Sequence, residues 1–224
     1  MAKLNEIKRG TNWVLYNDGT NDLIRIQGVR LSFPKIAYPE PETDDDNKPR
    51  IDPKTGKHKS SFSGVFMVPK DTHQDVLKIC VELINKLQKA NDAKVSTDKK
   101  FIRDGDDLTR EEYEGHYIIT ARESKRPPVR DRRGELIVEP EKIEQIFEAG
   151  VLVNVLIRPW FFNGKARGSN KDHPKRISAG LMGVQFHSDD GTRFSSGSVD
   201  ESDAWDVDDS APAGTDLDDD DDGL

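Results

Sequence analysis

One stretch, from Val151 to Arg176, limits most strongly what this chain can fold into. It begins with apolar residues at alternate positions, which is typical of a strand with one face in a core: Val151, Val153, Val155 and Ile157. The other face of the same strand then becomes cationic and aromatic, through Arg158, Trp160 and Phe162. Because Pro159 has no N–H to donate, it predicts a sheet edge, a bulge or the strand's end at that point.

The residues at the end of this strand suit a single-stranded polynucleotide. A glycine-bearing loop follows the aromatic residues and carries Lys165, Arg167, Lys171, Lys175 and Arg176. Bases stack on aromatic rings, and phosphates need positive charges beside them. The alternative is that the rings pack at the rim of a barrel and the loop is an ordinary solvated surface.

Two further strands change their apolar face partway along, which predicts bulges. In Leu23–Phe33 the change falls at Gly28, and in Arg176–His187 it lies beside Gly180 and Gly183. A β-bulge would return both apolar sets to one face and would coil the strand sharply. Such strands predict a small closed barrel.

The remaining pattern indicates more strands, one main helix and long loops. Phe62–Val68 and Tyr117–Arg122 are typical of strands, and Val129–Val138 of a hairpin. Ala37–Ser60 has no periodicity, so we expect a long exposed loop there. Met1–Asn21 is polar and predicts an arm or a loosely docked segment.

Two helices follow from periodicity and end signals. The main helix is expected to begin at Asp71 as N-cap with Gln74 completing a capping box, and its apolar stripe includes Cys80 as a buried hydrophobe. A short second helix is expected over Glu141–Phe147, with Gly150 as its cap.

The densest cationic cluster surrounds the predicted hairpin, whose tip is Asp131–Gly134. It consists of Lys125, Arg126, Arg130, Arg132 and Arg133. We expect this cluster to contact DNA, and an ordinary solvated turn is the alternative.

The charge is divided unevenly between the body and the C-terminal end. The formal net charge is −8, with 34 basic and 42 acidic residues. Twelve of the acidic residues and none of the basic ones lie between Ser198 and Leu224, so the body has a small positive excess. We expect this segment to be disordered, because it lacks the apolar residues of a core. As a flexible polyanion it could compete with DNA for a cationic groove, or it could only enhance solubility.

Composition argues against several other classes of protein. One cysteine cannot form an intrachain disulfide, and no apolar run approaches the roughly 20 residues of a membrane span. The start has no signal-peptide core, and the five histidines lack the spacing of a zinc site. We therefore expect a soluble cytoplasmic protein with no metal site.

At this point a resemblance to a known family becomes useful. The order of VRLSFP at Val29–Pro34, RPWFFNG at Arg158–Gly164 and GLMGVQF at Gly180–Phe186, followed by the acidic tail, resembles phage-encoded single-stranded-DNA-binding proteins of the OB-fold type. The resemblance covers about residues 20 to 188 and the tail. Tails of this family commonly end in an aromatic residue, whereas this chain ends in Leu224.

The resemblance implies a mainly β (α+β) chain with a five-stranded OB-fold-like barrel, one main helix, long loops and a disordered tail. It divides the chain into an arm (1–20), a DNA-binding domain (21–195) and an acidic tail (196–224). The implied function is to coat and protect single strands in phage replication and recombination, inside the host bacterium, without base specificity, without a cofactor and without catalysis.

The resemblance also implies which residues carry the function. Stacking would fall to Trp160, Phe162, Tyr117 and Phe33, and phosphate contacts to Arg158, Lys165, Arg167 and the Arg130–Arg133 tip. We expect these groups to converge on one trough. The tail residues Asp218, Asp219, Asp220, Asp221, Asp222 and Leu224 would compete with DNA and recruit replication or recombination proteins.

Three alternatives remain at this stage. An annealing or duplex-tolerant protein would use the same basic groove for double-stranded DNA. A metal-dependent nuclease could use Asp104, Asp106 and Asp107 as ligands. A DNA-mimic or interaction protein would act through its tail. The sequence does not determine the oligomeric state.

Overall fold

The computed structural model describes residues 3–43, 48–52, 55–165 and 172–194, all of which belong to one compact unit, Met1–Phe194. The predicted acidic tail lies outside these residues, and the three-part division of the chain stays a prediction. The described strands are β1 (Asn5–Arg9), β2 (Trp13–Asn17), β3 (Asp22–Pro41), β4 (Ser60–Pro69), β5 (Ile102–Asp104), β6 (His116–Glu123), β7 (Val129–Arg130), β8 (Leu136–Ile137), β9 (Leu152–Phe162) and β10 (Arg176–Ser188). The described helices are α1 (Gln74–Ala90), α2 (Pro140–Ile146) and the short 3₁₀ helices η1 (Thr97–Lys99) and η2 (Glu111–Tyr113).

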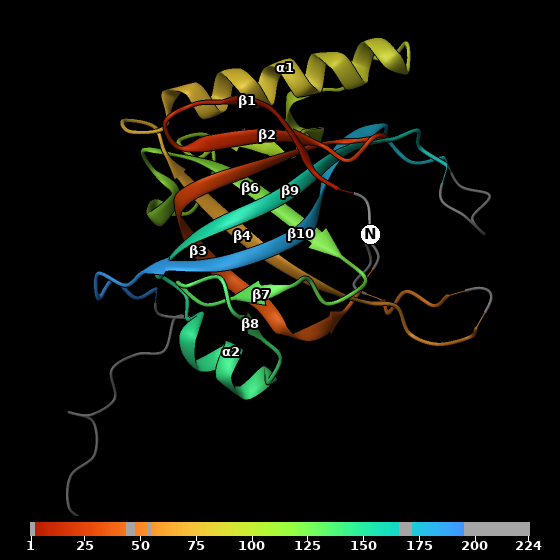
Figure 1. Cartoon of the computed structure of the whole chain (residues 1–224). Helices are drawn as coiled ribbons and strands as arrows, with labels where there is room; N and C mark the ends of the chain where they lie inside the picture. The colour runs from red at the N-terminus through yellow and green to blue at the C-terminus, as the bar shows by residue number, and fades with distance from the viewer. Residues whose placement is uncertain (1–2, 44–47, 53–54, 166–171, 195–224) are drawn as a thin grey trace, which may run out of the picture. The chain divides into compact units, whose positions relative to one another are not determined.

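Five of these strands close into a barrel, which confirms the predicted fold class. Around the barrel the hydrogen-bonded order is β3, β4, β6, β10, β9 and back to β3. The pairing of β10 with β6 is parallel, whereas the other four pairings of the barrel are antiparallel. Figure 1 shows α1 and α2 at opposite ends of this barrel.

The barrel closes because two strands are bulged where the sequence predicts it. The register between β3 and β9 shifts between Ile26 and Val29, and Gly28 lies there with a φ of 63°. The register between β10 and β9 shifts between Leu181 and Gly183. Both bulges return the apolar side chains to the interior, as expected.

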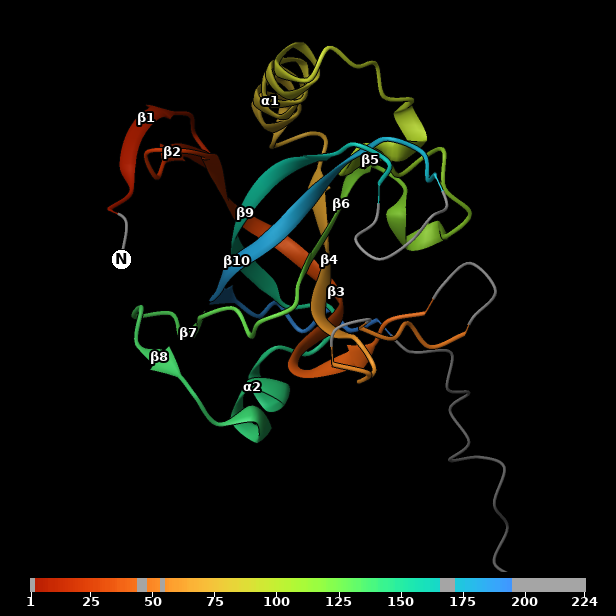
Figure 2. The same cartoon turned by 90° about the vertical axis from the view of Figure 1, so that its right-hand side faces the viewer.

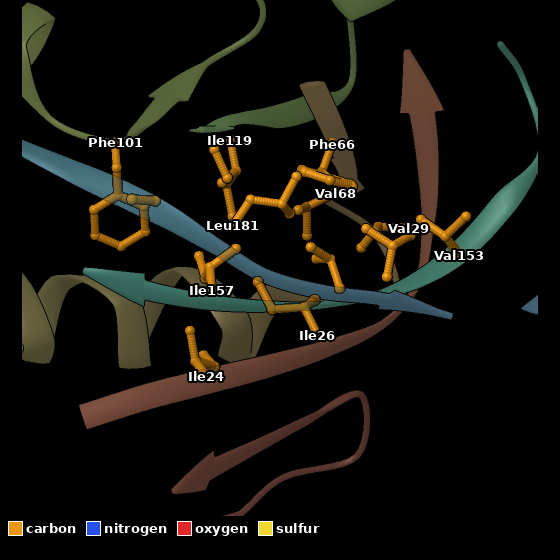
Figure 3. Packing of buried hydrophobic residues seen from close by; sticks show 14 of the residues in the cluster. Ile24, Ile26, Val29, Phe66, Val68, Phe101, Ile119, Val153, Ile157 and Leu181 are labelled. Atoms are coloured by element: carbon orange, nitrogen blue, oxygen red, sulfur yellow. The ribbon is translucent and has the colours of Figure 1, made fainter. Parts of the chain in front are cut away.

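The core lies inside the barrel and continues under α1. Alternate residues of β9 and of the coiled β3 meet side chains of β4, β6 and β10, as Figure 3 shows. The four alternating apolar residues at the start of the Val151–Arg176 stretch are each at most 1% exposed: Val151, Val153, Val155 and Ile157. Cys80 is fully buried, as predicted, and its burial raises the pKa of the thiol to about 12.

The N-terminal segment is more ordered than the sequence indicates. β1 and β2 form a hairpin, and β2 pairs with β3 from Trp13↔Ile26 to Asn17↔Asp22. Trp13 is buried at 5% exposure. The expectation of a loosely docked segment is therefore wrong for β2, because the short apolar triplet at Trp13 packs into the core, whereas all five residues of β1 are exposed.

Several element ends also differ from the predictions. β3 continues to Pro41, so the expected loop begins later, since Ile36 and Ala37 are buried. Helix α1 has His73 rather than Asp71 as N-cap, and no side chain caps it.

The second helix and the strand after it end differently as well. The C-cap of α2 is Phe147, and Gly150 instead donates its N–H to the Leu31 carbonyl. Strand β9 does not end at Pro159, but its pairing with β3 stops at Ile157. Pro159 therefore pairs with β10 alone and lies on a sheet edge, which is one of the three positions that the sequence predicts for it. Within the described residues, no helix is long and apolar enough to cross a membrane.

Candidate nucleic-acid interface

A groove of about 670 Å³ opens where three barrel strands meet two connections. It is formed by the end of β6, the end of β9, the start of β10, the segment from η1 to β5, and the β3–β4 connection. Figure 2 faces this side of the barrel. Its lining residues include Thr43, Arg50, Lys99, Lys100, Phe101, Arg103, Thr120, Arg122, Glu123, Arg158, Trp160, Arg176 and Ser178.

The floor of the groove is set by the pairing of three strands. Gly180 of β10 lies between Arg122 of β6 and Arg158 of β9. Paired residues of neighbouring strands project from the same face, so both guanidinium groups leave the outer face of the barrel. A Cβ on Gly180 would lie 3.4 Å from the Glu123 carboxylate and 3.7 Å from Arg158 Nη2. Because glycine has no side chain, the space between Glu123 and Arg158 above this position stays open.

Trp160 provides the exposed ring of the groove. It pairs with Ser178, and 39% of its surface is exposed. Phe162 contacts the indole edge-on, with 6.3 Å between ring centroids and 86° between planes. The guanidinium of Arg176 lies 4.4 Å from the Phe162 centroid. Phe162 therefore supports the indole from the side, and the indole keeps surface for a stacked partner.

The groove is electropositive. Its lining holds seven basic residues, Arg50, Lys99, Lys100, Arg103, Arg122, Arg158 and Arg176, against three acidic ones, Glu42, Asp98 and Glu123. Arg158 lies 3.7 Å from Glu123, and both side chains are about one-third exposed or less. An excess of cations in a concave surface concentrates polyanions there.

The structure places the residues predicted from the β9 stretch in or beside this groove. Arg158 and Trp160 line it, and Phe162 supports Trp160. Lys165 is exposed at the start of the β9–β10 connection and forms a β-bridge with Asp172. Arg167 lies outside the described residues, as do the tail residues.

The cations of the hairpin tip lie elsewhere. β7 pairs with β10 at Val184, toward the end of β10 opposite to Trp160. Arg132 and Arg133 line a second pocket of about 810 Å³ together with Gln145, Ile146, Phe186, Asp189 and Arg193. Arg130 donates a hydrogen bond of 2.7 Å to the Gly134 carbonyl. None of the described residues lines both pockets. The cations of the hairpin tip and the groove that holds Trp160 therefore do not form the single trough that we expected.

The other members of the basic cluster also differ in their surroundings. Arg126 donates hydrogen bonds to the carbonyls of Val138 (3.2 Å) and Ala37 (2.9 Å) and lies 5.7 Å from the Phe62 ring centroid. These contacts tie the hairpin to the end of β3. Lys125 is exposed between β6 and β7.

The two further aromatic residues lie outside the groove lining. Tyr117 is partly buried and packs against the core, with Lys70 Nζ 5.3 Å from its ring centroid. Phe33 lies on β3 with 41% of its surface exposed, and the Arg110 guanidinium lies 4.6 Å from its ring centroid.

The aspartates considered as nuclease ligands have structural partners. Lys70 forms salt bridges with both Asp104 and Asp106, and the hydrogen bond from Lys70 lowers the pKa of Asp106. Asp106 also accepts a hydrogen bond of 2.8 Å from the Gly115 N–H. Among the described residues, no three His, Cys, Asp or Glu side chains are grouped to hold a metal ion.

Five cations of the groove were not singled out as site residues from the sequence: Arg50, Lys99, Lys100, Arg103 and Arg122. The alternation of β6 places Arg122 on the same face as Thr120, opposite the buried Ala121, which was a readable signal. Lys99, Lys100 and Arg103 lie close together in the sequence, but only tertiary contacts bring them beside Arg50 and Arg122.

Comparison with known proteins identifies relatives. The family model described as the ssDNA-binding protein of Enterobacter phage Enc34 matches residues 23–216. The solved single-stranded DNA-binding protein from bacteriophage Enc34 is 33% identical, with a TM-score of 0.71 over 91% of this chain and 99% of that one. The same phage protein solved in complex with ssDNA is 32% identical, with a TM-score of 0.69 over 87% of this chain and 100% of that one.

A more distant structure shares the fold. The single-stranded DNA binding protein gp2.5 of bacteriophage T7 is 12% identical, with a TM-score of 0.51 over 88% of this chain and 100% of that one. None of the curated proteins compared with this chain matches it.

Proposed function

Since the chain belongs to the family of the ssDNA-binding protein of Enterobacter phage Enc34, we propose that it binds single-stranded DNA in the groove that holds Trp160 and Arg158. The observation that carries the proposal is the exposed indole in a groove with an excess of cations. A relative of similar fold has been solved with ssDNA, which supports this choice of ligand.

The groove suits a ligand that offers both bases and phosphates. One base would stack on Trp160, while the guanidinium groups of Arg122 and Arg158 would contact the phosphates on either side of Gly180. Stacking is available to every base, because each has a π-face, and phosphate contacts carry no sequence information. Binding would therefore be independent of sequence and would involve no bond cleavage.

Binding to duplex DNA is the second candidate function, because an electropositive groove also accepts paired strands. Stacking on Trp160 requires an unpaired base, so the indole favours the single strand. A titration of matched single-stranded and duplex oligonucleotides at several salt concentrations tests this choice. Tighter binding of the single strand that depends on Trp160 supports the proposal, and equal affinity for both forms contradicts it.

We also propose that the acidic residues 198–224 compete with DNA for the groove and, when released, recruit replication or recombination proteins. The opposed charges of the body and the C-terminal segment support this part. Deletion of residues 198–224 should tighten DNA binding, because it removes a competing polyanion. Replacing the five aspartates at 218–222 by asparagine keeps the length, so it separates charge from chain length; unchanged or weaker binding by both variants would refute competition.

The biological role that fits these properties is to coat and protect single strands during phage replication and recombination. The nuclease alternative rests on Asp104 and Asp106. Because both carboxylates contact Lys70, we expect Asp106→Ala to lower stability rather than to abolish a DNA cleavage activity. Cleavage by the pure protein that disappears in this variant would favour the nuclease.

A further inference from the structure

One acidic residue, Glu123, lies on the floor of the otherwise cationic groove. It is the last residue of β6 and directly follows Arg122. Another acidic residue of the lining, Asp98, is paired with Lys99 at 3.2 Å, and both of these side chains are exposed. A carboxylate on the floor of a site for a polyanion opposes binding, because like charges repel. Its position therefore calls for a physical reason.

The Glu123 carboxylate lies over Gly180. A Cβ on this glycine would be 3.4 Å from Glu123 Oε2, and Gly180 is paired with Arg122 on one side and with Arg158 on the other. The carboxylate oxygen is thus placed between the two strands that carry these arginines. Carboxylates and phosphates both present negatively charged oxygens to a guanidinium. Glu123 therefore occupies the space in which a phosphate would meet the two arginines.

The residue after Glu123 holds this carboxylate in place. Glu123 Oε1 accepts hydrogen bonds from the N–H of Ser124 at 3.0 Å and from its hydroxyl at 3.3 Å. Its other oxygen, Oε2, faces Arg158. Because the end of β6 sets the orientation of the carboxylate, this orientation does not depend on Arg158.

The contact between Glu123 and Arg158 is loose. Arg158 Nη2 and Glu123 Oε2 are 3.7 Å apart, which is longer than the roughly 2.7 to 2.9 Å of a charge-assisted hydrogen bond. The two side chains are 33% and 27% exposed, and ion pairs that solvent reaches contribute little to stability. An anion that forms true hydrogen bonds with Arg158 can therefore take the place of the carboxylate.

We propose that Glu123 is an internal competitor for DNA phosphates, which occupies Arg158 in the unbound protein and is displaced when a strand binds. The inference rests on the proposed function, and it adds a residue that limits affinity and so eases the release of a bound strand. The competing account is that Glu123 positions Arg158 for DNA. The two accounts predict opposite changes in affinity when the carboxylate is removed.

Two variants of Glu123 and one matched control test the proposal. Glu123→Gln removes the charge and keeps an oxygen that can accept from Ser124. Glu123→Ala removes the carboxylate without adding an amide donor that could itself bind phosphate. Glu82→Gln is the control, because Glu82 also contacts a cation at a long distance, Lys8 at 3.5 Å, but lies on α1 outside the groove lining. The thermal midpoint of each variant shows that it is folded.

Each full-length protein is titrated with a labelled oligothymidylate of about 12 nucleotides at several salt concentrations. At about 50 mM salt both Glu123 variants should bind about two- to fivefold more tightly than the wild type, whereas Glu82→Gln should bind as the wild type does. The slope of log K against log salt should become steeper by up to about 0.7, because the phosphate at Arg158 no longer replaces a carboxylate of the protein. Unchanged or weaker binding by both folded Glu123 variants overturns the proposal.

A second background identifies the cation for which Glu123 competes. In an Arg158→Gln protein, the further change Glu123→Gln should tighten binding less than it does in the wild type, because the competition requires the guanidinium. An equal gain in both backgrounds would mean that Glu123 only repels phosphates, and it overturns the proposal while the groove stands. A wild-type protein that binds no oligothymidylate refutes the proposed function and this inference together.

Discussion

Truncation of Trp160 to alanine should weaken single-strand binding without harming the fold. The indole is 39% exposed, and its edge-on contact with Phe162 lies at the barrel rim rather than in the core. A base stacked on an aromatic side chain is worth about 1 to 3 kcal/mol, which corresponds to about a 5- to 150-fold increase in Kd. The phosphate contacts that we propose for Arg122 and Arg158 would remain in this variant, so binding should be weakened rather than lost.

Fluorescence anisotropy of a labelled oligothymidylate of about 12 nucleotides measures this change. Tyr38→Ala is the matched control, because Tyr38 is an aromatic residue of 46% exposure that is hydrogen-bonded to Glu141 outside the groove. Its Kd should stay within about twofold of the wild type, far below the loss expected for a stacked ring. A Trp160→Ala protein with an unchanged thermal midpoint and an unchanged Kd would refute the stacking role of the indole.

Other predictions concern charge, pH and the thiol. Arg122→Gln should make the slope of log K against log salt shallower by about 0.7, because one phosphate contact is lost, and an unchanged slope would place the phosphates elsewhere. The hydrogen bond from Arg193 lowers the pKa of Asp189 to about 2, so this carboxylate stabilises the fold above its unfolded pKa of about 3.9 and loses that contribution as the pH falls toward 2. The thermal midpoint of the wild type should therefore fall more between these pH values than that of Asp189→Asn; parallel curves would contradict the ion pair. Cys80, with a pKa of about 12, should resist alkylation near neutral pH until the protein is unfolded in urea, and rapid labelling of the native protein would contradict its burial.

The barrel could be predicted because its signals are local. The change of apolar face at Gly28 and beside Gly183 shows directly where each strand must bulge, since side chains alternate strictly along a strand. The buried face of β9 is equally readable. The β1–β2 hairpin was missed because all five residues of β1 are exposed and carry no periodic signal.

The candidate site was only partly predictable, because its residues meet across strand pairs that are distant in the chain. Arg122 and Arg158 are brought together by Gly180, and that pairing is a property of the closed barrel rather than of any short motif. The basic cluster around the hairpin was interpreted as one unit, but its members have different surroundings: Arg126 binds backbone carbonyls, and Arg132 lines another pocket. Density of charge along a sequence therefore does not show which cations share a surface.

The most direct test of the groove follows the indole N–H signals of the three tryptophans by NMR during titration with oligothymidylate. The signal of Trp160, assigned by its loss in Trp160→Phe, should shift strongly as the complex forms, while that of the buried Trp13 should stay in place. A complex that forms while the Trp160 signal remains unmoved would contradict the groove as the binding site.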